Sequence, residues 1–334
     1  MKQIKVVLAI LMLTVLLLGG CGNSKSHYGT TVAATYGDRT IYLDEANFWL
    51  RASEIGASQY ASLYAQVYGI DYWTMDSGRR TQTVAESLKE DLMAEFRQIH
   101  ILLDHASEYD TTLTQEDLEK IDSTIAEMKS VYGSALFSEN VIGNFSDEKL
   151  KESLITRSQA LKVWHGVREQ ALTTVTDDEC KSFTVQFFRM SDTTSIKDNE
   201  LTLTGKAIAD LLENALKEGK TFDELKESYD SLYFETKSFR RNDTETDTEL
   251  FRVARDMTKG QVRQFTDSSS GSNIYYVVEC VSEEDDEAAA AAREALESVQ
   301  KEAHFNEILA HWQKDAKNFS VKGAFTSLPL PGGN

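Results

Sequence analysis

The sequence predicts an α+β protein in which a mainly helical region is followed by a smaller mixed region and then by a long helix. Three observations predict this order. Apolar residues recur every three or four positions through residues 84–103, which is the pattern of a helix that buries one face. Around Val175 the pattern changes, because residues 183–190 and 274–281 are rich in β-branched and aromatic residues. Acidic residues 283–287 then precede an alanine-rich stretch and suit the start of a long helix.

Residues 1–21 have the composition of a bacterial lipoprotein signal peptide. Lys2 and Lys5 precede an apolar run of about 13 residues, which is too short to span a bilayer as a permanent helix. The run ends in two glycines and Cys21, so we expect cleavage before Cys21 rather than an uncleaved anchor helix. An acylated Cys21 would then hold the chain on the outer face of the cytoplasmic membrane, with residues 22–31 as a tether.

Residues 32–174 are expected to form a helical domain. Residues 32–42 fit two short strands around a Gly-Asp turn, and Asp44 and Glu45 suit the start of the first helix. Breaks and N-cap residues that bound the following helices lie at residues 69–78, at Thr114 and at Ser146.

Residues 175–283 are expected to form a mixed domain with the order strand, two helices, strand, helix, strand. A long helix should follow within residues 284–320, and residues 321–334 should form a tail. The predicted strands cover residues 183–190, 232–239 and 274–281, and the predicted helices cover residues 205–218, a short stretch after the capping box at residues 221–224, and residues 250–257.

The order and spacing of these pieces resemble the PrsA-type foldases, which are membrane-anchored peptidyl-prolyl isomerases related to SurA. The resemblance implies a SurA/PrsA-like chaperone domain, an inserted parvulin-like α/β domain, and a C-terminal helix that returns to the helical domain. It is carried by residues 32–41 with Asp44 and Glu45, by the G-x-x-F-x-x-L pattern at residues 219–225, and by residues 250–251, 259–262 and 271–279.

The resemblance also implies where an isomerase site would lie. The two histidine positions of the family fall on Gln186 and Tyr276, and the acid or cysteine position falls near Asp230. Phe251 matches the phenylalanine of the prolyl pocket, whereas Asp247 replaces its apolar partner. Isomerisation crosses a barrier of about 18–20 kcal/mol without breaking a covalent bond, so hydrogen bonds from substituted residues could still assist it. We therefore expect weak or lost isomerase activity.

Other classes of site lack their required residues. No two of the six histidines have the three- or four-residue spacing of a helical metal site, and we expect no metal or other cofactor. Removing the signal peptide changes the net charge from −19 to −21, which disfavours nucleic acid as a partner. Cys180 and Cys280 remain after cleavage, and the sequence leaves open whether they pair.

The resulting functional hypothesis is a membrane-anchored extracytoplasmic chaperone or foldase whose partners are unfolded or newly exported polypeptides. An active peptidyl-prolyl isomerase is one alternative. A solute-binding lipoprotein is another, although it would need repeated strand-helix alternation in two lobes. The sequence predicts no oligomeric state. An aromatic group in the helical region consists of Tyr60, Tyr64, Tyr68, Tyr72 and Trp73. These side chains either form a surface for unfolded chains or pack in the helical core, and we expect core packing.

Overall fold

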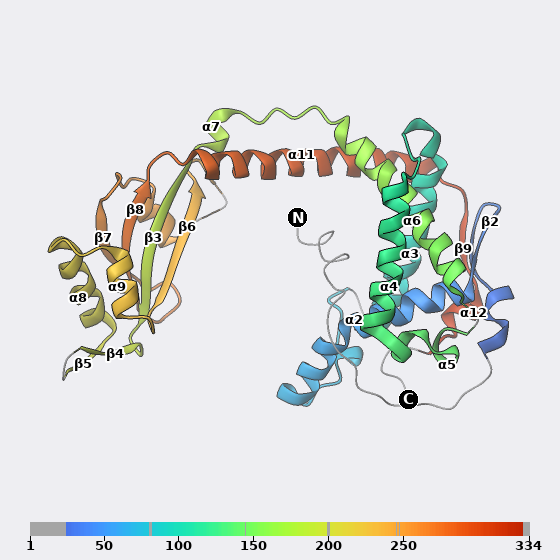
Figure 1. The fold of residues 1–334 in the computed structure, drawn as a ribbon, viewed down its shortest axis with the longest axis horizontal. Helices are drawn as coiled ribbons and strands as arrows, with labels where there is room; N and C mark the ends of the chain where they lie inside the picture. Colours follow the sequence, from blue (N-terminus) through green and yellow to red (C-terminus); the bar gives the residue numbers. More distant parts are fainter. Residues whose placement is uncertain are drawn as a thin grey trace. The chain divides into compact units, whose positions relative to one another are not determined.

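The computed structural model describes residues 25–79, 82–143, 145–198, 201–244, 246 and 248–329. The chain divides into two compact units (Figure 1). The first unit contains the residues up to 171 and those from 302 onward, and the second contains residues 172–301. Cys21 and the predicted signal peptide lie outside the described residues, so the predicted acylation site is not part of the structural account.

The first unit is mainly helical, and local capping explains where its helices begin. Thr83 accepts a hydrogen bond from the backbone of Glu86, whose carboxylate bonds back to the Thr83 backbone. The predicted N-caps Thr114 and Ser146 are confirmed. The helices are α2 (Leu43–Tyr68), α3 (Val84–Asp104), α4 (Gln115–Phe137), α5 (Glu139–Ile142) and α6 (Asp147–Glu169), with the short turns η1 (Lys25–Thr30), η2 (Tyr72–Thr74) and η3 (Ala106–Glu108). Of the predicted tether, residues 25–31 are described, and η1 covers all of them except Thr31.

A small antiparallel sheet joins the two ends of the described chain. Its strand order is β2-β1-β9, formed by β2 (Arg39–Tyr42), β1 (Val32–Tyr36) and β9 (Phe319–Val321). The prediction of a tail from residue 321 was therefore wrong, because Val321 belongs to β9. The long helix α11 (Asp286–Asp315) ends earlier, and the short helix α12 (Gly323–Thr326) follows β9.

The physical reason for this correction is burial of the last described residues. Phe325 and Leu328 enter the same apolar cluster as Leu50 of α2 and Leu92 of α3. The buried Lys89 of α3 donates from its Nζ to the Thr326 carbonyl oxygen at 3.1 Å and also to the carbonyl oxygen of Leu328. These contacts join parts of the chain that are distant in sequence, so a local sequence pattern gives no sign of them.

The last part of α11 contributes to the core of the first unit. Phe305, Leu309 and Trp312 are buried in one cluster with Ile101 of α3 and Val163 of α6. Among the described helices, none combines the length and the apolar character that crossing a membrane requires.

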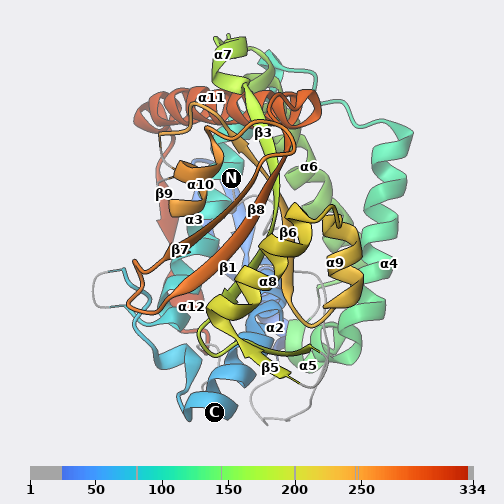
Figure 2. The same ribbon diagram turned by 90° about the vertical axis from the view of Figure 1, so that its left-hand side faces the viewer.

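The second unit contains an antiparallel four-stranded sheet with the order β6-β3-β8-β7. Helices α8 and α9 pack on one face of the sheet and α10 packs on the other (Figure 2). The bounds are α7 (Asp177–Cys180), β3 (Ser182–Ser191), α8 (Gly205–Lys217), α9 (Phe222–Ser228), β6 (Tyr233–Arg240), α10 (Glu249–Ala254), β7 (Val262–Asp267) and β8 (Ile274–Ser282).

One hairpin and one further strand of this unit were absent from the prediction. The polar loop expected after β3 is the hairpin of β4 (Ser195–Asp198) and β5 (Leu201–Thr204), in which Ile196 is buried against the helical side of the sheet. Strand β7 also went unpredicted, because its two apolar residues, Val262 and Phe265, are three positions apart and face opposite sides of the sheet, so they give no two-residue alternation. Cys180 and Cys280 are both buried free thiols, so the structure contains no bridge between them.

Candidate functional site

The structure places Gln186 and Tyr276 on opposite faces of the four-stranded sheet. Strand β3 pairs with β8 so that Gln186 is opposite Glu279 and Arg189 is opposite Tyr276. Residues that pair across strands share a face, and successive residues of a strand alternate between faces. Gln186 lies on the α8 and α9 face and donates from its Nε2 to a Glu279 carboxylate oxygen at 2.6 Å. Gln186 and Tyr276, the positions matched to the two histidines of the family, therefore do not form one site.

Asp230 and Phe251 do not complete such a site either. Asp230 is exposed in the turn after α9. Phe251 shares the α10 face with Tyr276, but it is only 3% exposed and its ring packs on Phe183 and Phe239 at centroid distances of 6.0 and 5.7 Å. It is therefore a core residue rather than the floor of an open pocket. Asp247 lies outside the described residues.

The residues that do surround Tyr276 are aromatic. Phe187 of β3 lies 5.7 Å from it between ring centroids, and Phe265 of β7 stacks on it at 4.9 Å. Tyr233 of β6 lies 6.5 Å from Phe187 and is half exposed. We call Phe187, Tyr233, Phe265 and Tyr276 the aromatic face. On β3 the residue beside Tyr276 is thus Phe187, one position after the predicted Gln186.

Two charged residues influence the phenols of the aromatic face. The Arg189 guanidinium lies 5.9 Å from the Tyr233 ring centroid, and its charge acts to lower the pKa of Tyr276. The Tyr233 hydroxyl donates to the Glu235 carboxylate at 2.7 Å, and this bond raises the pKa of Tyr233. Burial raises the pKa of Tyr276 despite the opposing effect of Arg189. Both phenols are therefore proton donors near neutral pH, and residues 172–301 contain no histidine to act as a base there.

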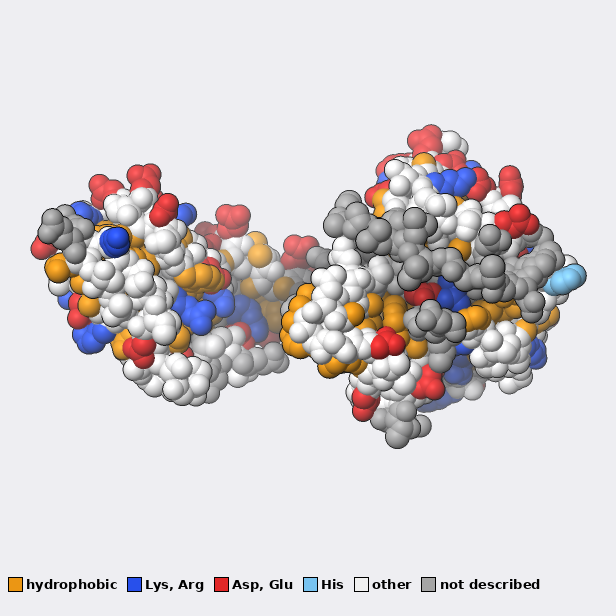
Figure 3. All heavy atoms as spheres, turned by 90° about the horizontal axis from the view of Figure 1, so that it is seen from below, with side chains coloured by type: hydrophobic (Ala, Val, Ile, Leu, Met, Phe, Trp, Pro, Cys, Tyr) orange, Lys and Arg blue, Asp and Glu red, His pale blue; other side chains and the backbone are white. Residues whose placement is uncertain are grey.

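A second candidate site is an apolar surface at the end of α2. All the buried residues of α2 lie within residues 43–50, and beyond them the helix exposes large apolar side chains. In a view of the molecule from below, hydrophobic side chains gather over the end of this helix (Figure 3). The exposed members, which we call the α2 patch, are Tyr60 (60%), Leu63 (53%), Val67 (59%), Tyr68 (63%) and Ile70 (45%).

The α2 patch corrects the expectation of core packing for the aromatic residues of this region. Of the five predicted core residues, only Trp73 is buried. Tyr64 packs on Tyr68 at 5.4 Å and on Tyr72 at 5.6 Å between ring centroids, so these rings extend the patch. Residues 55–70 contain no charged side chain, although 27% of the whole chain is charged. Exposed apolar surfaces of this kind are typical of sites that contact another protein, a membrane or a ligand.

Metal chemistry has no local support in the structure. The described residues contain no group of three or more histidine, cysteine, aspartate and glutamate side chains that could hold a metal ion. The two candidate sites offer aromatic and aliphatic surfaces for apolar contact, and the aromatic face adds phenol hydrogen-bond donors.

The chain is similar to solved structures of PrsA and SurA-like proteins. The foldase protein PrsA of Streptococcus pneumoniae is 16% identical, with 72% of this chain and 89% of that chain covered and a TM-score of 0.35. PrsA of Lactococcus lactis is 17% identical, with 88% of this chain and 96% of that chain covered and a TM-score of 0.36. A SurA-like chaperone of Campylobacter jejuni is 13% identical, with 87% of this chain and 99% of that chain covered and a TM-score of 0.29. No family model and no curated protein matches the sequence. These likenesses are distant, with identities of 13–17% and TM-scores of 0.29–0.36.

Proposed function

We propose that this protein is an extracytoplasmic chaperone, anchored to the membrane through Cys21, that binds unfolded segments of exported polypeptides. The observation that carries the proposal is the α2 patch, an uncharged and exposed apolar surface on an otherwise strongly acidic chain. Each large apolar side chain that such a surface buries on binding contributes about 1.5–3 kcal/mol before the cost of ordering the client.

The composition of the α2 patch favours binding that depends little on the sequence of the client. Tyrosine side chains provide large contact areas and lose little conformational entropy on binding. Leu63 and Val67 add apolar area without a directional hydrogen bond. The acidic net charge, −19 for the full sequence and −21 after cleavage before Cys21, keeps the remaining surface soluble and attracts basic client segments.

The second unit would add a second binding surface with little or no catalysis. The aromatic face offers Tyr233, Phe265 and Tyr276 to an extended segment. Rotation about a prolyl amide needs stabilisation of a twisted amide, for which the Arg189 guanidinium and the Tyr276 hydroxyl are the nearby donors. An isomerase built on these two groups, without histidine, is the second candidate function.

Suppression of client aggregation tests the first proposal. The full chain would be mixed with a chemically unfolded client, and light scattering would be followed during refolding. We expect suppression by the native chain and loss of at least half of it in the double variant Leu63→Ser, Val67→Ser. The matched control is Leu161→Ser, which changes a similar exposed residue of the first unit outside the α2 patch. Equal suppression by all three proteins would exclude the α2 patch as the client site.

A further inference from the structure

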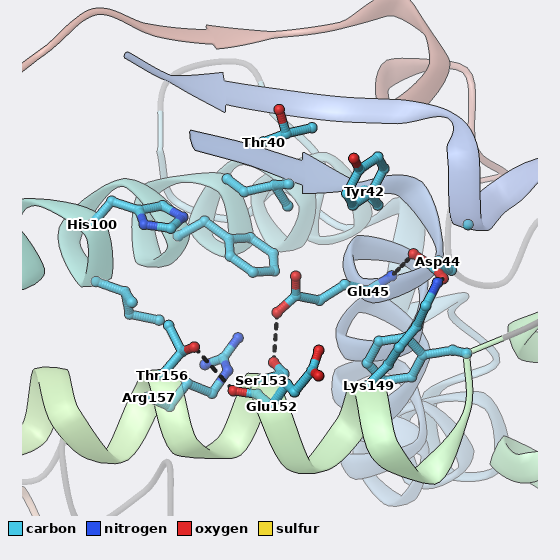
Figure 4. A pocket seen from close by; sticks show the side chains of 15 residues that line it. Thr40, Tyr42, Asp44, Glu45, His100, Lys149, Glu152, Ser153, Thr156 and Arg157 are labelled. Atoms are coloured by element: carbon cyan, nitrogen blue, oxygen red, sulfur yellow. Dashed lines mark hydrogen bonds and ion pairs between the residues drawn. The ribbon is translucent and has the colours of Figure 1, made fainter. Parts of the chain in front are cut away.

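The first unit contains a cavity that the chaperone proposal does not use. Its volume is about 440 Å³, and it lies between β2, the start of α2, α3 and α6 (Figure 4). Phe96 and Ile99 of α3, Ile41 of β2 and Phe145 provide apolar walls. This size is typical of sites for small ligands, and the lining combines these apolar walls with a larger number of polar and charged side chains.

His100 of α3 and Arg157 of α6 both line this cavity and have buried side-chain nitrogens without a hydrogen-bond partner among the described residues. Because burial lowers the pKa of His100 to about 4, the charged residue of the two is Arg157. Its side chain is 18% exposed, and its guanidinium lies over Trp49 at 4.1 Å and over Phe96 at 5.4 Å. Its Nη1 donates to the Glu95 carboxylate. Its Nε and Nη2 are buried and have no hydrogen-bond acceptor among the residues that the structure describes. Buried charged donors without an acceptor are rare, because leaving them unpaired costs more than about 1–3 kcal/mol.

The two unpaired nitrogens define the shape of the missing acceptor. The Nε and Nη2 of a guanidinium lie on one edge and direct two parallel N–H bonds. That edge matches the two oxygens of a carboxylate. Lys149, the other cation of the cavity, already pairs with the buried Asp44 at 2.5 Å. Arg157 is thus the cation left to bind an incoming anion.

The acids around the cavity are compatible with an anionic ligand. Glu45 accepts a hydrogen bond from the Ser153 hydroxyl at 2.5 Å and makes no ion pair with Arg157. Burial raises the pKa of Glu45, so this carboxyl takes up a proton more readily than an exposed one, although Arg157 and Lys149 oppose the effect and Asp44 adds to it. The other acid of the lining is the exposed Glu152, and Glu95 pairs with Arg157 without lining the cavity.

We propose that this cavity binds a carboxylate carried on an apolar body. The carboxylate oxygens accept from Nε and Nη2 of Arg157, and the apolar body packs against Phe96, Ile99 and Phe145. The same chemistry occurs in a small free carboxylic acid and in the C-terminal carboxylate of a polypeptide. The cavity shares no residue with the α2 patch, so an experiment can contradict this proposal without contradicting the chaperone proposal.

Calorimetric titration of the full chain tests the proposal. The probes are N-acetylphenylalanine, its C-terminal amide, and a short peptide ending in phenylalanine with a free or an amidated end. We expect the free acid of at least one pair to bind at least tenfold more tightly than the matching amide. The pair that shows the difference identifies the source of the carboxylate. Equal binding of acid and amide in both pairs, or no binding at millimolar concentration, would overturn the proposal.

Two variants of α6 distinguish the contribution of the paired N–H groups to binding from the contribution of the positive charge. Arg157→Lys keeps the charge and loses the paired N–H groups, so the free acid should bind at least tenfold more weakly. Arg168→Lys is the matched control, because Arg168 is 16% exposed, pairs with Glu302 and lies over Trp164 at 4.2 Å. Unchanged affinity in a folded Arg157→Lys protein contradicts the proposal. If that variant does not fold by circular dichroism, Thr156→Phe, which narrows the cavity, takes its place with the same expected loss.

Discussion

The ring of Phe187 lies 5.7 Å from that of Tyr276, whereas Gln186, one residue earlier, lies on the opposite face of the sheet and bonds to Glu279. This relationship decides which side chains can touch a client on the aromatic face. It also means that replacing Gln186 and replacing Arg189 should have different consequences.

Any isomerase activity of the chain should depend on Arg189 and Tyr276 and not on Gln186. In a proline-peptide assay, Arg189→Met and Tyr276→Phe should each reduce the rate about tenfold or more, because each removes a donor from the aromatic face. Gln186→Ala is the matched control and should leave the rate unchanged. A rate that falls only with Gln186→Ala would place the site on the α8 and α9 face and contradict this assignment.

The C-terminal segment should stabilise the first unit rather than behave as a tail. Phe325 is 2% exposed, so Phe325→Ala should lower the free energy of unfolding by about 3–5 kcal/mol. Urea denaturation followed by tryptophan fluorescence measures this change. Val321→Ala, at a 38% exposed position of the same segment, should cost less than about 1 kcal/mol. Similar small losses for both variants would mean that Phe325 is not part of the core.

His100 should make the first unit less stable in acid. The pKa of His100 is lowered from 6.5 to about 4 in the folded chain, and burial is the largest cause of this shift. Between these values the unfolded chain binds more protons than the folded chain, so stability falls as the pH drops from 6.5 to 4. His100→Phe keeps a ring beside Tyr36 and removes this titration. The melting temperature of the native chain should therefore fall more than that of the variant over this interval, and parallel curves would refute the prediction.

The lipid anchor should depend on Cys21 alone. Cys21→Ser should abolish fatty-acid labelling of the chain in a bacterial host and move the protein from the membrane fraction to the soluble fraction. A serine variant that stays in the membrane fraction would point instead to an uncleaved helix or to another attachment.

Local features of the sequence predicted much of the fold. The capping residues Thr114, Ser146 and Thr221 fix helix starts through hydrogen bonds to neighbours three residues away, and sequence shows such neighbours directly. The long strands β3 and β8 were also evident, because their β-branched and aromatic content is high.

Features that depend on tertiary packing could not be predicted in this way. Phe187 and Phe188 are adjacent apolar residues, so composition does not reveal which one faces Tyr276, and an error of one residue selects the wrong face. The exposure of Tyr60 and Tyr68 depends on which elements cover the end of α2. The incomplete hydrogen bonding of Arg157 is likewise visible only once α3 and α6 are packed together.

Site-specific photocrosslinking tests the central claim most directly. A photoreactive amino acid would replace Leu63 in the α2 patch or, as the control, Leu161 on α6, and each full chain would be irradiated with an unfolded client. The chaperone account predicts strong crosslinking to the client from position 63, little from position 161, and loss of the position 63 product once the client has folded. Equal crosslinking from both positions, or none from position 63, would contradict it.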